Sequence, residues 1–160
     1  MVVITLSAVL LFSTLAAYRE FTQKNQLSVL VNDLTHALNY ARASAITLQA
    51  GITFCANNGI GACGSDWQKG QIILNESNQA VLYELPALPS GYHLFWRSTL
   101  GDSADLRWRS DGFTRGQQGS FFVCGRKEHH ERSAQIIILR TGRIRVEMGV
   151  NKRISSECNK

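Results

Sequence analysis

Proline is scarce throughout this 160-residue chain, and charge is absent from its first 18 residues. Pro86 and Pro89 are its only prolines, which excludes a proline-rich linker protein. Residues 1–18 contain no charge, no proline and no glycine. About 18 apolar residues are enough to cross the hydrocarbon core of a bilayer, so we expect residues 1–18 to be a transmembrane segment. Ala16 and Ala17 resemble a signal-peptide cleavage site, but the helical pattern continues past them, which a cleaved signal would not explain.

The apolar segment runs without a break into an amphipathic pattern that reaches about Gln49. From Leu27 on, apolar residues recur at spacings of three and four, which places them on one helical face. The sequence therefore predicts one helix over residues 1–49, membrane-spanning in its first half and amphipathic in its second. At 1.5 Å per residue it would be roughly 70 Å long. An ordinary single-pass anchor explains the apolar run but not this extension. The positions that form the face are Leu27, Leu30, Leu34, Leu38, Ala41, Ala45 and Leu48.

After residue 50 the period changes from helical to alternating, and turn residues separate short runs. This pattern is typical of antiparallel strands. The fold class is therefore α+β: a long N-terminal helix followed by a mainly antiparallel β-rich domain over residues 50–160. The chain has no internal repeat. The predicted strands are 51–55, 67–74, 80–85, 92–98, 105–109, 112–115, 120–124, 135–139 and 143–148.

Four cysteines form an even set behind the expected membrane segment. That arrangement favours disulfides in an oxidising compartment over cytosolic thiols. The sequence allows three pairings. We favour Cys55 with Cys63, which closes a glycine-rich loop, and Cys124 with Cys158, which ties the carboxyl tail to a strand.

Positive charge is concentrated at the carboxyl end. Residues 140–160 contain six basic and two acidic residues, a net charge of +4 where the whole chain carries +5. A basic end on a secreted domain indicates an anionic partner, such as DNA, lipid head groups or acidic polysaccharide. The alternative is a tail that is merely solubilising.

The predicted hairpin around Arg140, Thr141 and Gly142 gives this charge a geometry. Arg143 and Arg145 would point to one face of a strand, about 7 Å apart, with Ile144 and Val146 turned toward the core. Gly142 would keep the turn small. The planar guanidinium group suits phosphate oxygens. The alternative is a solvated pair bridged to Glu147. If Cys158 is bridged to Cys124, the tail brings further cations near; these are Lys152 and Arg153, with Arg140 and Lys160 as weaker candidates.

Catalytic and metal-binding patterns are weak. No Ser-His-Asp, Cys-His or paired-carboxylate arrangement has a suggestive spacing, so we expect no enzyme, no catalytic residue and no cofactor. His129 and His130 would form a zinc site only with Cys124 and Cys158. Their charged surroundings and the expected disulfide argue against it, so we expect no metal site. We expect the tryptophans to lie in the core rather than to stack on bases; these are Trp67, Trp96 and Trp108.

Several motifs, in order along the chain, resemble the type IV pilin-like superfamily and, within it, the GspH/FimT family. The most specific is Thr141-Gly142-Arg143-Ile144-Arg145, which is similar to the Gly-Arg-X-Arg motif of FimT proteins. The resemblance covers essentially the whole chain. The other motifs are Met1–Ile4, Asn32–Ser44, Cys55 to Gly70, Asp111–Thr114, Phe121–Cys124 and Ile136–Arg145.

The resemblance implies a minor type IV pilin that binds extracellular DNA without sequence specificity, for uptake in natural transformation. Other pilin subunits, reached through the N-terminal helix, would be its partners. The subunit would span the inner membrane once before assembly and then stand in an extracellular pilus. Two alternatives remain: a minor pseudopilin of type II secretion acting in filament assembly, and a surface adhesin for acidic glycans.

The leader that the resemblance implies lies outside this sequence. Family precursors have a short leader ending in glycine and an acidic residue near the mature start. The first acidic residue here is Glu20. Processing by prepilin peptidase is therefore an expectation from the resemblance alone.

Overall fold

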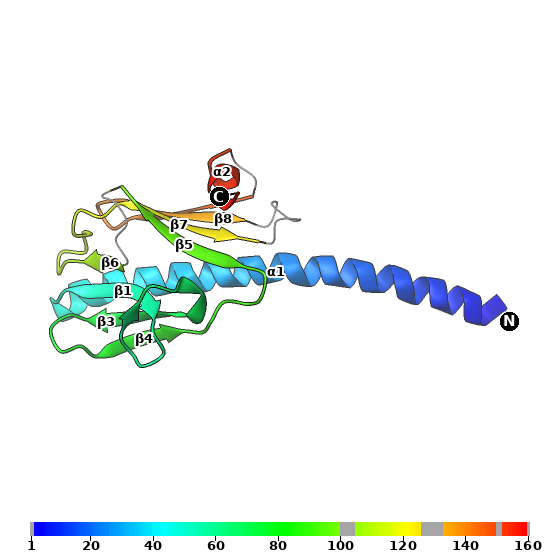
Figure 1. The fold of residues 1–160 in the computed structure, drawn as a ribbon, viewed down its shortest axis with the longest axis horizontal. Helices are drawn as coiled ribbons and strands as arrows, with labels where there is room; N and C mark the ends of the chain where they lie inside the picture. Colours follow the sequence, from blue (N-terminus) through cyan, green and yellow to red (C-terminus); the bar gives the residue numbers. More distant parts are fainter. Residues whose placement is uncertain (1, 100–104, 126–132, 150–151, 160) are drawn as a thin grey trace.

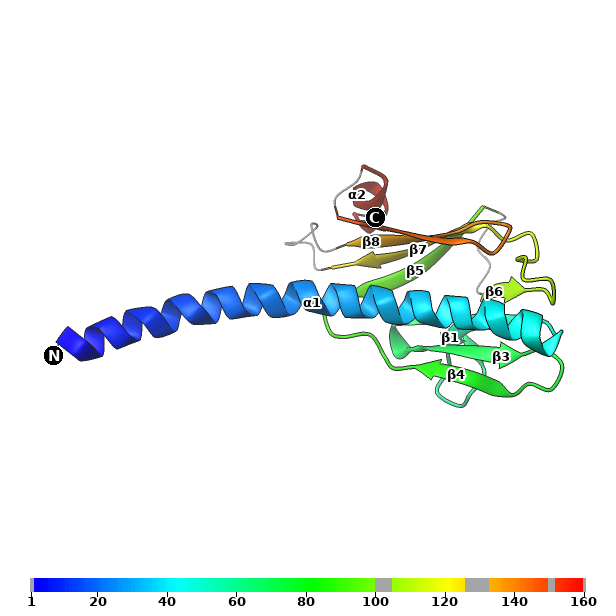
Figure 2. The same ribbon diagram turned by 180° about the vertical axis from the view of Figure 1, so that it is seen from behind.

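A long helix and two antiparallel sheets make up the fold (Figure 1). The computed structural model describes residues 2–99, 105–125, 133–149 and 152–159, with side chains from Asn25 onward. Helix α1 (Val2–Leu48) projects its N-terminal half away from the domain, and both sheets lie against its other half (Figures 1 and 2). The α+β fold class is confirmed.

The membrane segment expected over residues 1–18 precedes Asn25, where the described side chains begin. Within the described part, no helix is long and apolar enough to cross a bilayer.

The second half of α1 buries one face, as its spacing predicts. The buried positions follow the i, i+3, i+4 pattern and join the main core. Leu48 is the exception, because it is 50% exposed in the last turn, next to Gln49 with its positive φ of 50°. The buried positions are Leu27, Val31, Leu34, Ala37, Leu38, Ala41, Ser44 and Ala45.

The first sheet is built around β1 (Ile52–Asn57). One edge of β1 pairs with β3 (Gln71–Asn75), which pairs with β4 (Val81–Leu85). The other edge pairs with β6 (Asp105–Trp108) and, further along, with β2 (Cys63–Gly64). Phe54 lies opposite Ile73 and Leu106, and these three side chains enter the main core.

The second sheet has the order β5-β7-β8-β9, antiparallel throughout. Its strands are β5 (His93–Ser98), β7 (Gly119–Cys124), β8 (Ala134–Ile138) and β9 (Ile144–Met148). Phe121 and Ile136 face α1 in the main core, whereas Phe122 faces away. Helix α2 (Lys152–Cys158) lies on that outer side, away from α1 (Figures 1 and 2), where Ile154 packs on Phe122 and Cys124.

Three local predictions are wrong. Trp67–Lys69 is a 3-10 helix whose N-terminus is capped by Asp66, and the strand begins only at Gln71, after Gly70. The run 112–115 is a turn with one bridge, between Trp108 and Thr114. Val146 is 39% exposed instead of anchoring the core, because β9 is the edge strand. Helix α2 was not predicted.

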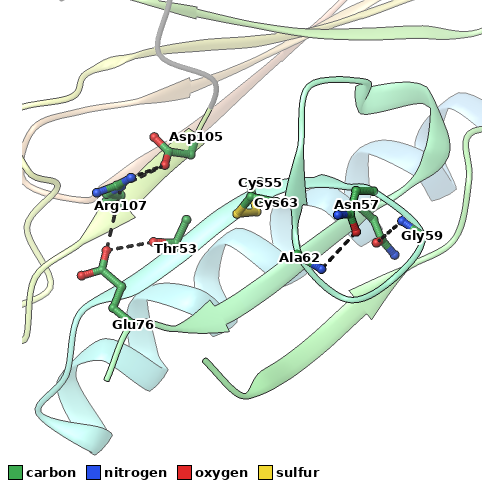
Figure 3. The surroundings of a disulfide bond; sticks show 10 residues. Thr53, Cys55, Asn57, Gly59, Ala62, Cys63, Glu76, Asp105 and Arg107 are labelled. Carbon is green, nitrogen blue, oxygen red and sulfur yellow. Dashed lines mark hydrogen bonds and ion pairs between the residues drawn. A yellow bond between two sulfur atoms is a disulfide. The ribbon is translucent and has the colours of Figure 1, made fainter. Parts of the chain in front are cut away.

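Two disulfides are present, in the pairings that the sequence favours. Cys55–Cys63 joins β1 to β2, with Cα atoms 5.5 Å apart (Figure 3). Within the loop it closes, the Asn58 side chain accepts hydrogen bonds from the backbone N–H groups of Ile60 and Ala62, at 2.9 and 3.1 Å. Cys124–Cys158 ties α2 to β7.

Candidate nucleic-acid interface

The turn between β8 and β9 positions the Gly-Arg-X-Arg motif. The Gly142 N–H donates to the carbonyl oxygen of Leu139 at 2.8 Å, and the Leu139 N–H donates to that of Arg143 at 3.0 Å. Gly142 has a φ of +76°, in the left-handed region that side chains other than glycine's seldom adopt. The hydrogen bonds close a tight hairpin with Arg140 at its tip and Arg143 at its exit.

A second turn, after β6, has the same geometry. The Gly112 N–H donates to the carbonyl oxygen of Arg109 at 2.9 Å, and the Arg109 N–H donates to that of Phe113 at 2.8 Å. Gly112 has a φ of +77°. The two turns are thus copies of one structure, 30 residues apart in the sequence.

The two turns pack directly on each other. Thr114 donates to the carbonyl oxygen of Arg140 twice, from its backbone N at 3.1 Å and from its hydroxyl at 3.3 Å. The carbonyl oxygen of Gly112 also accepts a hydrogen bond from Arg42 Nε of α1, at 3.2 Å. A Cβ on Gly142 would collide with that carbonyl oxygen and would lie 2.9 Å from Arg42 Nε. The β8–β9 turn is therefore fixed from two sides.

The arginines of the motif are exposed around this turn. Arg145 Nη2 lies 3.7 Å from Glu147 Oε1, which is the neutralising pair considered from the sequence. Within the described ranges, Arg140 and Arg143 form no ion pair. The neighbouring turn contributes little net charge, because Arg109 Nη2 lies 2.7 Å from Asp111 Oδ2. The turn thus presents two uncompensated guanidinium groups.

The basic tail is ordered but lies elsewhere on the second sheet. Lys152 and Arg153 are exposed in the first turn of α2. Helix α2 packs on β7, and β8 separates β7 from β9. A contact between Arg97 Nε and Glu157 Oε2 at 3.4 Å joins α2 to β5.

Arg145 pairs across the sheet with Ile137 and Ser120, on the face that α2 covers in part. The tail therefore shares a face with Arg145 but not the turn itself. Lys160 lies outside the described residues.

The three tryptophans and Arg107 have structural roles. Trp108 is fully buried between the exposed Arg107 and Arg109, and Trp67 and Trp96 are 7% exposed, so all three belong to the core. A hydrogen bond from Arg107 to Asp105, together with nearby carboxylates, raises the pKa of Arg107 (Figure 3). Both residues lie on β6, and Arg107 Nε also lies 4.0 Å from Glu76 Oε1, just after β3.

Metal ligands do not gather in the part of the chain that the structure covers. No group of three histidine, cysteine or acidic side chains there has the arrangement of a metal site. Cys124 and Cys158 are bonded to each other, and His129 and His130 lie outside the described residues.

One residue at the turn escaped the sequence interpretation. Arg42 lies on α1, about 100 positions before Arg143, and nothing local connects it with the motif. The available signal was its isolation: it is the only Lys, Arg, Asp or Glu between Asp33 and Asp66. A lone charge on an otherwise neutral helix face indicates a specific contact.

Solved structures of two bacterial proteins share this fold. The type IV minor pilin FimU of Pseudomonas aeruginosa strain PAO1 matches with a TM-score of 0.63 and 21% identity over 79% of this chain and 92% of that chain. The minor pseudopilin EpsH of the Vibrio cholerae Type 2 Secretion System matches with a TM-score of 0.57 and 12% identity over 77% of this chain and 97% of that chain. No curated protein sequence matches.

A family model identifies the relationship more directly. The model of the type II transport protein GspH matches residues 30–142, from the amphipathic half of α1 to the β8–β9 turn. This match covers more than half of the chain and ends at Gly142, so Arg143 and Arg145 lie beyond it. The chain therefore belongs to the GspH/FimT family of type IV pilin-like proteins.

Proposed function

We propose that this protein is a minor type IV pilin that binds extracellular DNA, without sequence preference, for uptake in natural transformation. The observation that carries the proposal is the rigid β8–β9 turn with its exposed Arg140 and Arg143. A structural arginine normally ends on a carboxylate, and these two do not within the described residues. The guanidinium fork fits phosphate oxygens well.

Sequence-independent binding follows from the shape of the site. DNA bases are read by side chains that enter a groove, usually from a helix or a two-stranded ribbon. Here a tight turn presents exposed arginines and no recognition helix, which suits contacts to the sugar-phosphate backbone. Arg145 joins them at the cost of its contact with Glu147. We propose Lys152 and Arg153 as secondary contacts, on the face of the second sheet that Arg145 shares.

Membership of the family supports the cellular part of the proposal. FimU is described as a type IV minor pilin, and members of the family are structural proteins rather than enzymes. We propose that α1 anchors the subunit in the inner membrane before assembly. Its projecting half would then pack among the helices of other pilin subunits in the pilus (Figure 1).

A titration of the full chain in nonionic detergent against a short labelled duplex tests the proposal. Binding should weaken steeply with salt, since each phosphate contact contributes about −0.9 to the slope of log K against log salt concentration. The double variant Arg143→Glu/Arg145→Glu should bind about 100-fold more weakly or not at all, with an unchanged circular dichroism spectrum. Wild-type protein that fails to bind at low salt would overturn the proposal.

Lys69→Glu provides a control matched in charge to Arg143→Glu. Each single reversal changes the net charge from +5 to +3. Lys69 has a side chain that is 70% exposed, and it lies near Gly70, which pairs with Asn57 at the end of β1. The turns lie near Trp108, which pairs with Ile52 at the start of β1. Equal losses in both variants would show that only net charge matters.

The alternative, a minor pseudopilin acting in type II secretion, is favoured by the match to the GspH family model and by a pocket on α1. An apolar cavity of about 430 Å³ lies between α1 and the segment after β4, lined by Val29, Leu30, Leu85, Pro86 and Pro89 among others. Val29 is 58% exposed there. Such a cavity suits contact with another subunit. Loss of secretion in a Val29→Glu variant, with DNA binding unchanged, would favour this alternative.

A further inference from the structure

We infer that Arg42 of α1 is a further phosphate ligand of the DNA site, so that the site spans the helix and the hairpin. The inference rests on the proposed function and extends it to a residue outside the Gly-Arg-X-Arg motif. The Arg42 side chain runs against Gly142, the residue that precedes Arg143.

The contacts of Arg42 use only part of its hydrogen-bonding capacity. The guanidinium group has five N–H donors, and Nε donates one of them to the carbonyl oxygen of Gly112 at 3.2 Å. This bond fixes the plane of the group beside the turn. The four N–H groups on Nη1 and Nη2 form no hydrogen bond within the described residues, and no acidic residue there pairs with them. Arg42 is partly exposed, so these donors are open to a ligand.

The charges around Arg42 make an anionic ligand favourable. Gly142 lies between the Arg42 side chain and the backbone of Arg143, and Arg140 is two residues earlier in the same turn. Arg42 therefore lies beside the turn that carries Arg140 and Arg143, and none of these three arginines has a carboxylate partner in the described chain. The nearest acid in the paired turn, Asp111, already contacts Arg109 at 2.7 Å. A polyanion that bridges the three groups relieves their mutual repulsion.

The fixed geometry also favours binding over a purely structural role. A bracing contact needs one donor, and Nε already supplies it. A lysine or a glutamine would also brace the turn by a single hydrogen bond. An arginine at this place adds further N–H donors in one plane, on Nη1 and Nη2, and such a planar set can hold phosphate oxygens.

The salt dependence of DNA binding separates a phosphate contact from a structural brace. Full-length Arg42→Gln in nonionic detergent should bind the duplex about tenfold more weakly, with the slope of log K against log salt reduced by about one unit. Arg42→Lys keeps the charge and should keep the wild-type slope. Lys69→Gln, the control for net charge, should bind within twofold of wild type with an unchanged slope.

The outcomes distinguish failure of this inference from failure of the proposed function. If wild-type protein does not bind DNA, the proposed function fails and Arg42 has no ligand to share. If wild type binds, Arg143→Glu/Arg145→Glu abolishes binding and Arg42→Gln keeps the wild-type slope, this inference alone is overturned. Weaker binding with an unchanged slope also overturns it, since Arg42 would then act only through the turn. If Arg42→Gln does not fold, a folded Arg42→Lys with a slope reduced by one unit overturns it.

Discussion

The carbonyl oxygen of Gly112 occupies the space that a Cβ on Gly142 would need. The two glycines lie in turns of the same geometry, and each turn is held by the other and by Arg42. Because Gly142 is part of the Gly-Arg-X-Arg motif, its first role is to let the hairpin approach the second turn. The arginines that follow are then displayed from a fixed base.

The first prediction concerns this close approach. Gly142→Ala should lower the free energy of unfolding by about 3 kcal/mol or more, because it adds steric overlap to the cost of a positive φ. Gly149→Ala is the matched control: its φ is +92°, and a Cβ there would meet nothing within 4 Å. It should cost only about 1 kcal/mol. Denaturant unfolding of both variants gives the comparison, and equal losses would contradict the packing of the two turns.

The second prediction concerns the acid beside Arg145. Glu147→Gln should tighten DNA binding several-fold, because it removes the carboxylate that Arg145 contacts at 3.7 Å and leaves that arginine to a phosphate. Fluorescence anisotropy against the same duplex measures the change. Asp66→Asn removes one acid near Lys69, on the far side of the first sheet, and should leave the affinity unchanged. Tightening in both variants would indicate general charge instead of a local site.

The third prediction concerns the two disulfides. Cys124–Cys158 spans 34 residues and Cys55–Cys63 spans 8. In the chain-entropy model their removal by paired serine substitution should cost about 3.8 and about 2.5 kcal/mol, respectively. The order of the two midpoints in denaturant checks the model. Loss of the longer bridge should also release α2 from β7, which hydrogen exchange of α2 amides would detect.

Removal of Cys124–Cys158 also tests whether the tail, with Lys152 and Arg153, is a secondary contact for DNA. If Lys152 and Arg153 contribute to binding while they are held on the second sheet, removal of Cys124–Cys158 should weaken DNA binding a few-fold at low salt. The shorter disulfide lies on the other sheet, so its removal should leave binding unchanged. Unchanged affinity in both variants would restrict the site to the turn and Arg42.

Local patterns were enough to predict the elements near the site. The face of α1 followed from the spacing of Leu27, Leu34 and Leu38, and the β8–β9 hairpin followed from Gly142 between two alternating runs. These features depend on neighbours within a few residues. The 3-10 helix at Trp67 was missed although its signals are equally local, since Asp66 caps it and Gly70 ends it.

The composite site could not be predicted in the same way. The hydrogen bond from Arg42 to Gly112 joins residues 70 positions apart, and the bonds from Thr114 to Arg140 join residues 26 apart. No periodicity relates such positions, because tertiary packing alone brings them together. The sequence also did not show that β9 is the edge strand of its sheet. Val146 was therefore expected in the core, although β9 has a neighbouring strand on one side only.

DNA uptake by cells that express Arg143→Glu/Arg145→Glu in place of the wild-type chain is the most direct test of the central claim. Surface filaments and protein secretion are measured in the same cells. We predict that uptake of labelled DNA is lost, while filaments and secretion stay at wild-type levels. Wild-type uptake in the variant would contradict the claim, and so would a loss of filaments or secretion that accounts for the lost uptake.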